Sequence, residues 1–541
     1  MDNTLPNAAS AESAIQQQLA QGFAYLQHDQ FEQANQLADQ LLAAHAQHAE
    51  VAFFASEARL AMDDAESALR FIDVAIEAAP GQLPLLLNKA ETLMRLRRRR
   101  EARQVATDAV VLAGSDGQAL WAIGKLFSRN NDPTNARPLY EQALTSIGHH
   151  PDLLYDLAIA RYFIGDVAGA EQALEWLLAV APKAGHALYL RATLKRQTQA
   201  SNHVADLESR LRSAFPNPLA RAGCLFALAK ECEDLDQAQP SFAALAEANA
   251  LKHASLTHDA GAECASIDAV RDTYTSQVMQ APTVGHEEAG PIFIVGMPRT
   301  GTTLVERMLG RHSAVRSAGE LLDFGQLLAA AAQAQAKTQP EASLSEASLN
   351  IDFAALGRAY MLSARDAAGG STLFIDKMPI NYIYCGLIKK ALPQARIIHL
   401  VRSPMDACYA AYKTWFNQAY YFSYDMDELA TYFATYQRMM QHWHTVMPGV
   451  ILDIHYEQLV TDTETQARRI SDHCGLDWQE AVLNPAANDT PATTASAAQV
   501  RQPVHSGSVD KWRRYESQLA PLKARLMDLG IVDVDGNALS P

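Results

Sequence analysis

The sequence of 541 residues has no apolar run that approaches the length of a membrane span, and it begins without the basic stretch and apolar core of a secretory signal. We therefore expect a cytoplasmic protein without a membrane span. Its six cysteines lack the close pairing of a zinc site or a disulfide framework, so we expect reduced thiols and no bound metal. The net charge of −16 argues against nucleic acid as a partner.

The length predicts more than one hydrophobic core. Apolar residues make up 48% of the chain and charged residues 20%, which is an ordinary globular composition. A Pro- and Gly-containing stretch near residue 285 separates two regions of different pattern, and a helical pattern at Ile267–Met279 precedes it. We predict a flexible N-terminus (1–14), a repeat region (15–254), a helical linker (255–290), a second domain (291–520) and a C-terminal tail (521–541).

Small residues recur every 34 residues through the first half. One series is Gly22, Ser56, Ala90, Gly124, Ala158 and Ala192, and it fails at Phe226; a second runs from Ala34 through Ala68, Ala102 and Ala136 to Ala170. Each unit holds two helix-length stretches, such as Ala52–Met62 and Ala65–Ala78. This pattern resembles the tetratricopeptide repeat (TPR), which implies an N-terminal α-solenoid of about six repeats and a degenerate seventh. The resemblance implies a concave groove for a protein or peptide, and a scaffold or homodimer surface has equal support.

The second half alternates short apolar runs with helical patterns, which is typical of a parallel sheet covered on both faces. Ligands of such sheets bind at the carboxyl ends of the strands. We expect strands at Ile292–Val295, Thr372–Ile375, Ile397–Val401 and Val450–Ile454.

A glycine-framed turn follows the first of these strands. Gly296 and Gly301 have the spacing of a nucleotide phosphate loop, and a helix over Thr302–Leu309 would direct its positive end toward an anion. Thr302 stands where a triphosphate-binding loop has the lysine that reaches the β- and γ-phosphates. The turn therefore suits a nucleotide that ends in a singly charged sulfonyl group better than a triphosphate.

The segment Pro298-Arg299-Thr300-Gly301-Thr302-Thr303 resembles the 5′-phosphosulfate loop of sulfotransferases that use 3′-phosphoadenosine 5′-phosphosulfate (PAPS). The arginine at this position of the loop is similar to that of the protein-tyrosine sulfotransferase branch of the family. The resemblance, which covers about residues 291–515, implies a P-loop-like α/β sulfotransferase domain with a parallel sheet. It implies that these six residues bind PAPS and that the reaction needs no metal.

The same resemblance implies four catalytic residues. Glu320 follows Arg299 by the family's step of 21 residues and would be the general base that takes the acceptor's proton. Arg299 and Lys377, with Ser496 from the closing segment, would stabilise the charge of the transferring group.

Further cofactor-binding residues are implied by later blocks of the family. Arg402 would hold the 3′-phosphate, although Ala410 stands where the family usually has a second, hydroxyl-bearing contact. Tyr456, in a YEQLV block, would contact the nucleotide, as would Ser496 and Lys511. We expect the stretch Asn488–Ser508 to act as a lid over the bound cofactor.

The resemblance thus implies sulfuryl transfer from PAPS to a hydroxyl, with a polypeptide tyrosine as the favoured acceptor. A carbohydrate, a lipid or a small phenol is an alternative acceptor, and an aromatic-rich stretch from Tyr409 to Phe422 is either an acceptor wall or core. A phosphoryl-transferring kinase is disfavoured, since Thr302 stands in the lysine position and the third strand ends in a basic residue where magnesium needs a carboxylate. A non-catalytic TPR scaffold with a nucleotide-binding domain stays open.

Overall fold

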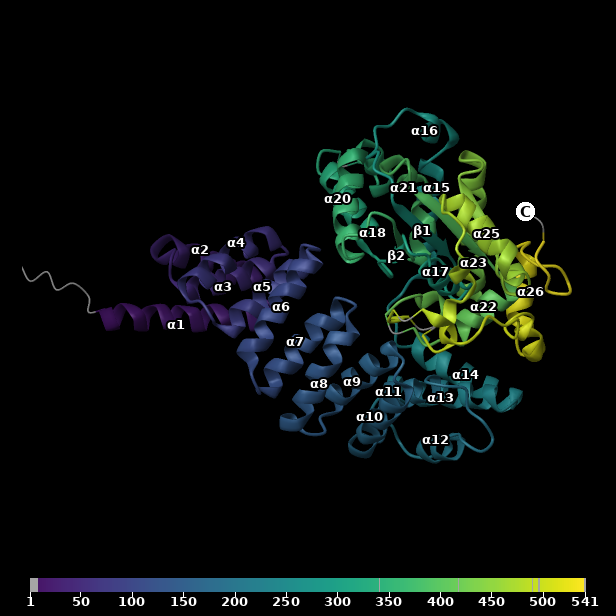
Figure 1. Ribbon diagram of the computed structural model, residues 1–541, viewed down its shortest axis with the longest axis horizontal. Helices are drawn as coiled ribbons and strands as arrows, with labels where there is room; N and C mark the ends of the chain where they lie inside the picture. Colours follow the sequence, from purple (N-terminus) through teal and green to yellow (C-terminus); the bar gives the residue numbers. More distant parts are fainter. Residues whose placement is uncertain (1–7, 340, 417, 489, 495–496, 540–541) are drawn as a thin grey trace, which may run out of the picture. The chain divides into compact units, whose positions relative to one another are not determined.

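A computed structural model describes residues 8–339, 341–416, 418–488, 490–494 and 497–539 (Figure 1). Its internal contacts divide the chain into two compact units, Met1–Asp156 and Leu157–Pro541. The division falls within the predicted repeat region, so the second unit contains the later repeats together with the α/β domain. The domain boundaries expected from the sequence stay predictions.

The first unit consists of antiparallel helix pairs. These helices are α1 (Ala8–Gln27), α2 (Phe31–His45), α3 (Ala49–Ala61), α4 (Ala65–Ala78), α5 (Leu83–Arg95), α6 (Arg99–Ala113), α7 (Gly117–Arg129) and α8 (Pro133–Ile147), and α9 (Pro151–Ile164) crosses into the second unit. A Cβ atom on Gly22 would lie 2.3 Å from the Phe54 ring, and one on Gly124 would lie 2.4 Å from the Tyr140 ring. The small residues recur because paired helices approach closely at these positions. Helix α1 begins at Ala8, inside the segment predicted to be flexible.

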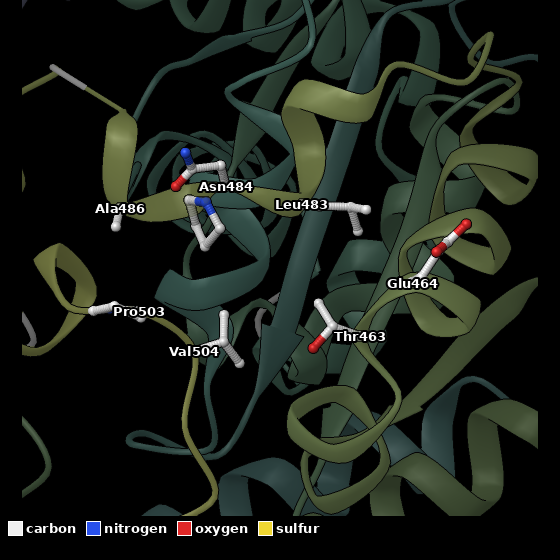
Figure 2. A pocket seen from close by; sticks show the side chains of 8 residues that line it. Thr463, Glu464, Leu483, Asn484, Ala486, Pro503 and Val504 are labelled. Carbon is white, nitrogen blue, oxygen red and sulfur yellow. The ribbon is translucent and has the colours of Figure 1, made fainter.

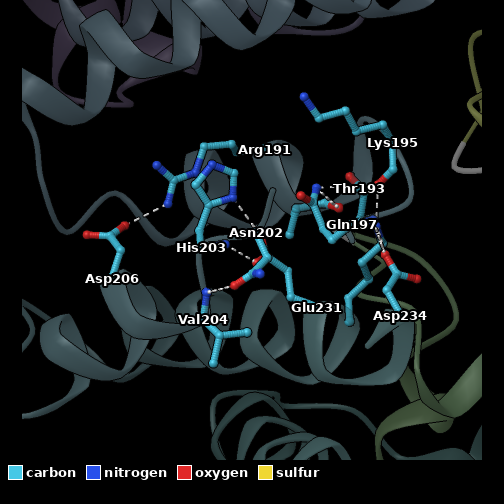
Figure 3. A network of polar contacts seen from close by, with 12 residues as sticks. Arg191, Thr193, Lys195, Gln197, Asn202, His203, Val204, Asp206, Glu231 and Asp234 are labelled. Atoms are coloured by element: carbon cyan, nitrogen blue, oxygen red, sulfur yellow. Dashed lines mark hydrogen bonds and ion pairs between the residues drawn. The ribbon is translucent and has the colours of Figure 1, made fainter. Parts of the chain in front are cut away.

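The second unit continues the helix pairs. Its repeat helices are α10 (Val167–Val180), α11 (Gly185–Thr193), α12 (Val204–Leu211), α13 (Pro218–Asp234) and α14 (Ala238–His253). The connection between α11 and α12 is held by polar contacts with α13 (Figure 3). Buried Glu231 accepts a hydrogen bond from the His203 backbone at 2.5 Å, and Asp234 accepts one from the Gln197 backbone at 2.8 Å. These contacts join the irregular connection between α11 and α12 to helix α13.

The linker contains two helices instead of the single one predicted at Ile267–Met279. Helix α15 (Ala260–Thr273) ends before buried Tyr274, and α16 (Ser276–Gln280) begins after it. The Thr275 hydroxyl accepts a hydrogen bond from the Val278 backbone at 3.4 Å, which caps a new helix at this point.

A five-stranded parallel sheet forms the centre of the α/β domain. The strands are β1 (Pro291–Gly296), β2 (Arg316–Ser317), β3 (Phe374–Asp376), β4 (Arg396–Val401) and β5 (Ile451–His455), in the order β2-β3-β1-β4-β5. The four predicted strands are confirmed, with small differences at their ends. Strand β2 escaped prediction because it has two residues and both are exposed.

Helices cover the sheet. They are α17 (Thr302–Leu309), α18 (Asp323–Ala336), α19 (Leu344–Ala347), α20 (Phe353–Ala367), α21 (Cys385–Ala391), α22 (Pro404–Tyr412), α23 (Met426–Val446), α24 (Tyr456–Thr461), α25 (Thr463–Cys474) and α26 (Ala520–Asp528). The 3-10 helices are η1 (Ser348–Asn350), η2 (Pro379–Tyr384), η3 (Tyr421–Tyr424), η4 (Glu480–Leu483), η5 (Pro485–Ala487), η6 (Gln499–Arg501) and η7 (Lys511–Tyr515). Leu522 and Leu526 of α26 are fully buried, although this segment was predicted to be a tail. Among the described residues, no helix has both the length and the apolar composition needed to cross a membrane.

Candidate functional site

The carboxyl edge of the sheet brings most of the predicted site residues together. The glycine turn follows β1, Glu320 follows β2, Lys377 follows β3, Arg402 follows β4 and Tyr456 follows β5. Because the strand order is β2-β3-β1-β4-β5, Glu320 and Lys377 lie on one side of the turn and Arg402 and Tyr456 on the other. This edge is where open α/β sheets bind their ligands.

The turn itself has a backbone that only glycine adopts easily at two positions. Gly296 has φ of +149°, and a Cβ there would lie 2.8 Å from the Leu400 carbonyl. Gly301 has φ of +104°, and a Cβ there would lie 2.6 Å from the Tyr456 ring. The buried Thr300 hydroxyl donates to the Met297 carbonyl at 2.8 Å, which closes the turn.

Helix α17 begins directly after the turn. Gly301 is its N-cap residue and has no side chain to satisfy the first backbone N–H groups. Thr302 and Thr303 form the first turn of the helix and are buried, as is Pro298 on the other side of the loop. The first backbone N–H groups of the helix therefore have no capping side chain, and anion binding at the turn stays a prediction.

We expect Gly301→Ala to lower the free energy of unfolding by ~1–3 kcal/mol, because alanine disfavours the positive φ and its Cβ meets the Tyr456 ring. Urea unfolding measures the change. The control is Gly261→Ala, since a Cβ at Gly261 would contact only the Asp259 side chain, at 3.2 Å. Equal unfolding midpoints for Gly301→Ala and the wild type would contradict the account of the turn.

Lys377 is fully buried and lies between two carboxylates. It forms an ion pair with Glu320, and its Nζ lies 3.7 Å from Glu306 Oε2. Burial would lower the pKa of Lys377, but the charges of Glu306 and Glu320 outweigh burial and raise it. The lysine is therefore a fixed cation beneath the edge of the sheet.

The two acidic partners of Lys377 differ in exposure. The Glu320 side chain is 41% exposed, whereas that of Glu306 is 12% exposed and accepts a hydrogen bond from the Ser317 hydroxyl at 2.5 Å. An incoming hydroxyl can therefore reach Glu320 from solvent. Sequence reasoning missed Glu306, because a glutamate on the helix after the turn carries no signal of its own.

Asp376, the neighbour of Lys377, faces a different environment. It is fully buried and accepts a hydrogen bond from the Tyr360 hydroxyl at 2.7 Å. Burial raises the pKa of Asp376 to about 8. The ion-pair partners of Lys377 are thus Glu306 on α17 and Glu320 after β2. Asp376, its neighbour in sequence, is hydrogen-bonded to Tyr360 instead.

Arg402 is held rigidly beside the turn. Its Nη1 donates to the Arg299 carbonyl at 2.8 Å and its Nη2 to the Ser508 carbonyl at 2.6 Å, and its guanidinium lies 4.7 Å from the centre of the Tyr456 ring. Its buried Nε has no hydrogen-bond partner among the described residues. A preorganised guanidinium with an unused donor fits a bound anion.

Ala410, which follows Arg402 in the chain, lies on α22 and is buried. One turn later, the Thr414 hydroxyl donates to the Ala410 carbonyl at 2.8 Å, so this hydroxyl is already used. The contact that the family usually places at position 410 is therefore not replaced by Thr414.

Arg299 lies at the tip of the turn with φ of +67°. Burial lowers the pKa of Arg299, and nearby Arg402 lowers it further, whereas Tyr189 and Tyr162 raise it. Both tyrosines belong to repeat helices, α11 and α9. Tyrosines of the repeats in the second unit therefore influence the arginine of the turn, which the sequence did not predict.

Lys511 pairs with a repeat helix. Its Nζ lies 3.2 Å from Glu233 Oε2 on α13, and Lys413 Nζ lies 2.9 Å from the same oxygen. The Tyr409 hydroxyl donates to Glu233 Oε1 at 2.7 Å. Burial would raise the pKa of Glu233, but Lys413 and Lys511 hold it at about 2. The proposed nucleotide lysine is thus anchored by the repeat region.

We expect Glu233→Gln to lower the free energy of unfolding at pH 7 by ~3–5 kcal/mol, because two lysines lose their buried counter-charge. The ordinary pKa of this carboxyl is 4.5 and the folded value is about 2, so its stabilisation is complete above pH 4.5 and disappears as the pH falls toward 2. Urea unfolding at pH 7 and pH 3 should therefore show the wild-type advantage shrinking. A constant difference between the two proteins would contradict this assignment.

Ser496 lies outside the described residues. The described parts of the predicted lid contact α9: the Ala492 backbone donates to the Phe163 carbonyl at 3.1 Å, and the Ala498 backbone donates to the Tyr162 hydroxyl at 3.1 Å. The lid stays a prediction.

The aromatic-rich stretch after α22 is mainly core. Trp415 stacks on Phe226 with ring centres 5.8 Å apart, and Phe422 stacks on Tyr432 at 3.5 Å. The 34-residue series fails at Phe226 because this position packs on the α/β domain. Burial raises the pKa of Tyr420, and the negative charge of Glu320 raises it further.

A pocket of about 360 Å³ opens between the start of α25, η4, η5 and residues 503–504 (Figure 2). Its lining consists of Thr463, Glu464, Leu483, Asn484, Pro485, Ala486, Pro503 and Val504. None of the predicted site residues lines this pocket.

Comparison with known proteins gives family matches in both halves of the chain. Residues 291–480 match the sulfotransferase family, and residues 87–151 and 129–194 match tetratricopeptide repeats. An uncharacterized protein of Aquifex aeolicus (strain VF5) is 29% identical over 408 residues, which are 74% of this chain and 53% of that protein. The chain therefore spans about half the length of this relative.

Two further relatives have assigned names. Protein-tyrosine sulfotransferase 1 of Danio rerio is 24% identical over 47% of this chain and 76% of its own length, and protein-tyrosine sulfotransferase A of Caenorhabditis elegans is 25% identical over 42% and 62%. The solved sulfotransferase domain of the Synechococcus PCC 7002 olefin synthase is 24% identical, with a TM-score of 0.32 over 43% of this chain and 91% of that domain. The chain combines tetratricopeptide repeats with a domain of the sulfotransferase family.

Proposed function

We propose that this protein transfers a sulfuryl group from PAPS to a hydroxyl, and that the acceptor is a tyrosine in a polypeptide. The observation that carries the proposal is the convergence of a glycine turn at the start of α17, a buried lysine and an exposed carboxylate at one edge of the sheet. The sulfotransferase family match and the distant similarity to protein-tyrosine sulfotransferases support it.

The donor would bind with its 5′ groups at the turn and its 3′-phosphate at Arg402. The turn offers the backbone N–H groups at the start of α17, and Arg402 offers a buried Nε without a partner among the described residues. Both are charge-assisted donors for phosphate-type oxygens. With Ala410 in place of a hydroxyl, Arg402 would carry more of the 3′-phosphate contact.

The transfer then needs one proton acceptor and one fixed cation. Glu320 would accept the proton of the attacking hydroxyl as its oxygen forms a bond to sulfur. The bond between sulfur and the bridging phosphate oxygen breaks, and adenosine 3′,5′-bisphosphate leaves. Lys377 and Arg299 would stabilise the negative charge that grows on the bridging and sulfonyl oxygens, and Ser496 is proposed to assist them.

Two features support a polypeptide acceptor. The Tyr189 hydroxyl accepts a hydrogen bond from the Trp415 backbone and the Tyr162 hydroxyl accepts one from the Ala498 backbone, so a ligand on this part of the repeats would lie beside the α/β domain. Burial and the charge of Glu320 both raise the pKa of Tyr420, so this tyrosine belongs to the electrostatic surroundings of the proposed base. Repeats of this kind commonly bind extended peptides.

The test is incubation of the purified chain with PAPS and a panel of tyrosine peptides, followed by mass spectrometry for sulfated products. Matched peptides with phenylalanine in place of tyrosine are the control, and a sugar, a lipid alcohol and a small phenol cover the other acceptors. Sulfation of the tyrosine peptides alone is the expected result. Sulfation of another class would contradict the polypeptide acceptor, and sulfation of none would contradict the proposed reaction.

A further inference from the structure

Three metal-ligating side chains meet on one face of the sheet, outside the residues used for transfer. His399 lies on β4, and its register partner on the neighbouring parallel strand β5 is Asp453. Partners in register point to the same face of a sheet. His444 reaches them from α23. The three side chains therefore come from regular elements, which hold ligands more precisely than loops do.

The ligand atoms of this cluster lie close together. Asp453 Oδ1 lies 2.8 Å from His399 Nδ1 and 3.0 Å from His444 Nε2, and the three atoms all lie within 4.8 Å of one another. Ligands about 2.0 Å from a tetrahedral zinc ion are separated by roughly 3.3 Å, so a small opening of the cluster would admit the ion. We propose that His399, His444 and Asp453 bind one divalent transition metal ion, for which zinc is the best match.

The donor set favours zinc over magnesium or calcium. Two imidazoles and one carboxylate suit zinc and other late transition metals, whereas magnesium and calcium need oxygen ligands. His399 is 5% exposed, while the side chains of His444 and Asp453 are 35% and 36% exposed. One side of the cluster is therefore open to solvent, where a water molecule would complete four-coordination.

The charges around the cluster are compatible with a cation. Asp453 Oδ1 lies within hydrogen-bond distance of both imidazoles, so one carboxylate oxygen faces the two ring nitrogens. The neighbouring Arg469 donates to the backbone carbonyl of Asp453 at 3.4 Å and to the Gln466 side chain at 2.5 Å.

The outer contacts of His399 are those of a metal ligand. Its second ring nitrogen, Nε2, lies 2.5 Å from the hydroxyl of buried Tyr436 on α23. Such a partner fixes the orientation of the imidazole and directs the other nitrogen, Nδ1, toward the metal. The Tyr436 hydroxyl also interacts with the backbone of Met297, at the start of the glycine turn.

The metal would therefore join β4, β5 and α23 behind the turn. It would act on the stability of the sheet and the turn, and it would take no part in sulfuryl transfer, for which no metal is expected. The proposal does not depend on PAPS, so it can succeed or fail independently of the proposed function.

The experiment is a zinc titration of the full chain by isothermal calorimetry, after treatment with a chelator and its removal. We expect one equivalent of zinc to bind. His444→Ala and Asp453→Asn should lose binding, and Tyr436→Phe should weaken it by about 10- to 100-fold. His442→Ala is the matched control, because His442 also lies on α23 but contacts the Tyr274 carbonyl at 2.9 Å.

Thermal unfolding gives a second measurement. Zinc should raise the Tm of the wild type and of His442→Ala with increasing concentration, and it should leave the Tm of His444→Ala and Asp453→Asn unchanged. Circular dichroism of each variant without zinc checks that it is folded. No zinc binding to the wild type, or equal binding to all variants, would overturn the proposal.

Discussion

Replacing Glu320 with glutamine should reduce sulfuryl transfer at least about 100-fold, because the amide cannot take the proton of the attacking hydroxyl. The affinity for adenosine 3′,5′-bisphosphate should remain, since Glu320 lies across the turn from Arg402. Turnover with PAPS and calorimetry with the bisphosphate measure the two effects separately. This separation distinguishes an enzyme from a repeat scaffold that only binds a nucleotide.

The stability of the Glu320→Gln variant should change little. The Glu320 side chain is 41% exposed, and buried Lys377 keeps Glu306 Oε2 at 3.7 Å as a second partner, so the loss should be about 1 kcal/mol. Glu287→Gln, at an exposed position of the linker, is the control for the loss of one carboxylate. Unchanged product yield from Glu320→Gln would remove Glu320 from the role of general base.

Replacing Lys377 with methionine should have two large effects. Transfer should fall by about 10²- to 10³-fold, because the fixed cation beside the transferring group is lost. The free energy of unfolding should fall by ~3–5 kcal/mol, because Glu306, which is 12% exposed, keeps its charge without an ion-pair partner. A PAPS assay and urea unfolding measure the two effects.

A double variant separates stability from chemistry. Lys377→Met with Glu306→Gln removes the unpaired carboxylate and should recover much of the lost stability, while transfer stays low. Recovery of transfer together with stability would mean that Lys377 only supports the fold. The proposed electrostatic role would then be wrong.

The sheet and the turn could be predicted because their signals are local. Apolar runs mark β1, β3, β4 and β5, and the glycine spacing marks the turn. The helix after the turn begins at Thr302 and ends at Leu309, as predicted. Parallel strands have their carboxyl ends at the same edge of the sheet. Glu320, Lys377 and Arg402 each follow a strand, so they lie at that edge.

Contacts between distant segments could not be predicted. Lys413 and Lys511 meet Glu233, which lies 180 and 278 residues before them in the chain, and nothing in the local sequence of Glu233 marks it as their partner. Lys377 finds Glu306 in the same way. The sequence therefore predicts which residues follow the strands, whereas the buried ion pairs of Glu233 and Glu306 are seen only in the structure.

The break in the linker shows a second limit of sequence patterns. Apolar periodicity continues through Ile267–Met279, but a buried tyrosine and a capping threonine interrupt the backbone between α15 and α16. The periodicity of apolar residues indicates which face of a helix is buried. It does not indicate where one helix ends and the next begins.

The most direct test of the account is a calorimetric titration of the chain with adenosine 3′,5′-bisphosphate at low salt. Binding of one equivalent is expected, with the heat lost in Arg402→Ala and the affinity reduced for adenosine 5′-monophosphate, which lacks the 3′-phosphate. No heat with the wild type, or equal binding by Arg402→Ala, would contradict the assignment of this edge of the sheet as a PAPS site.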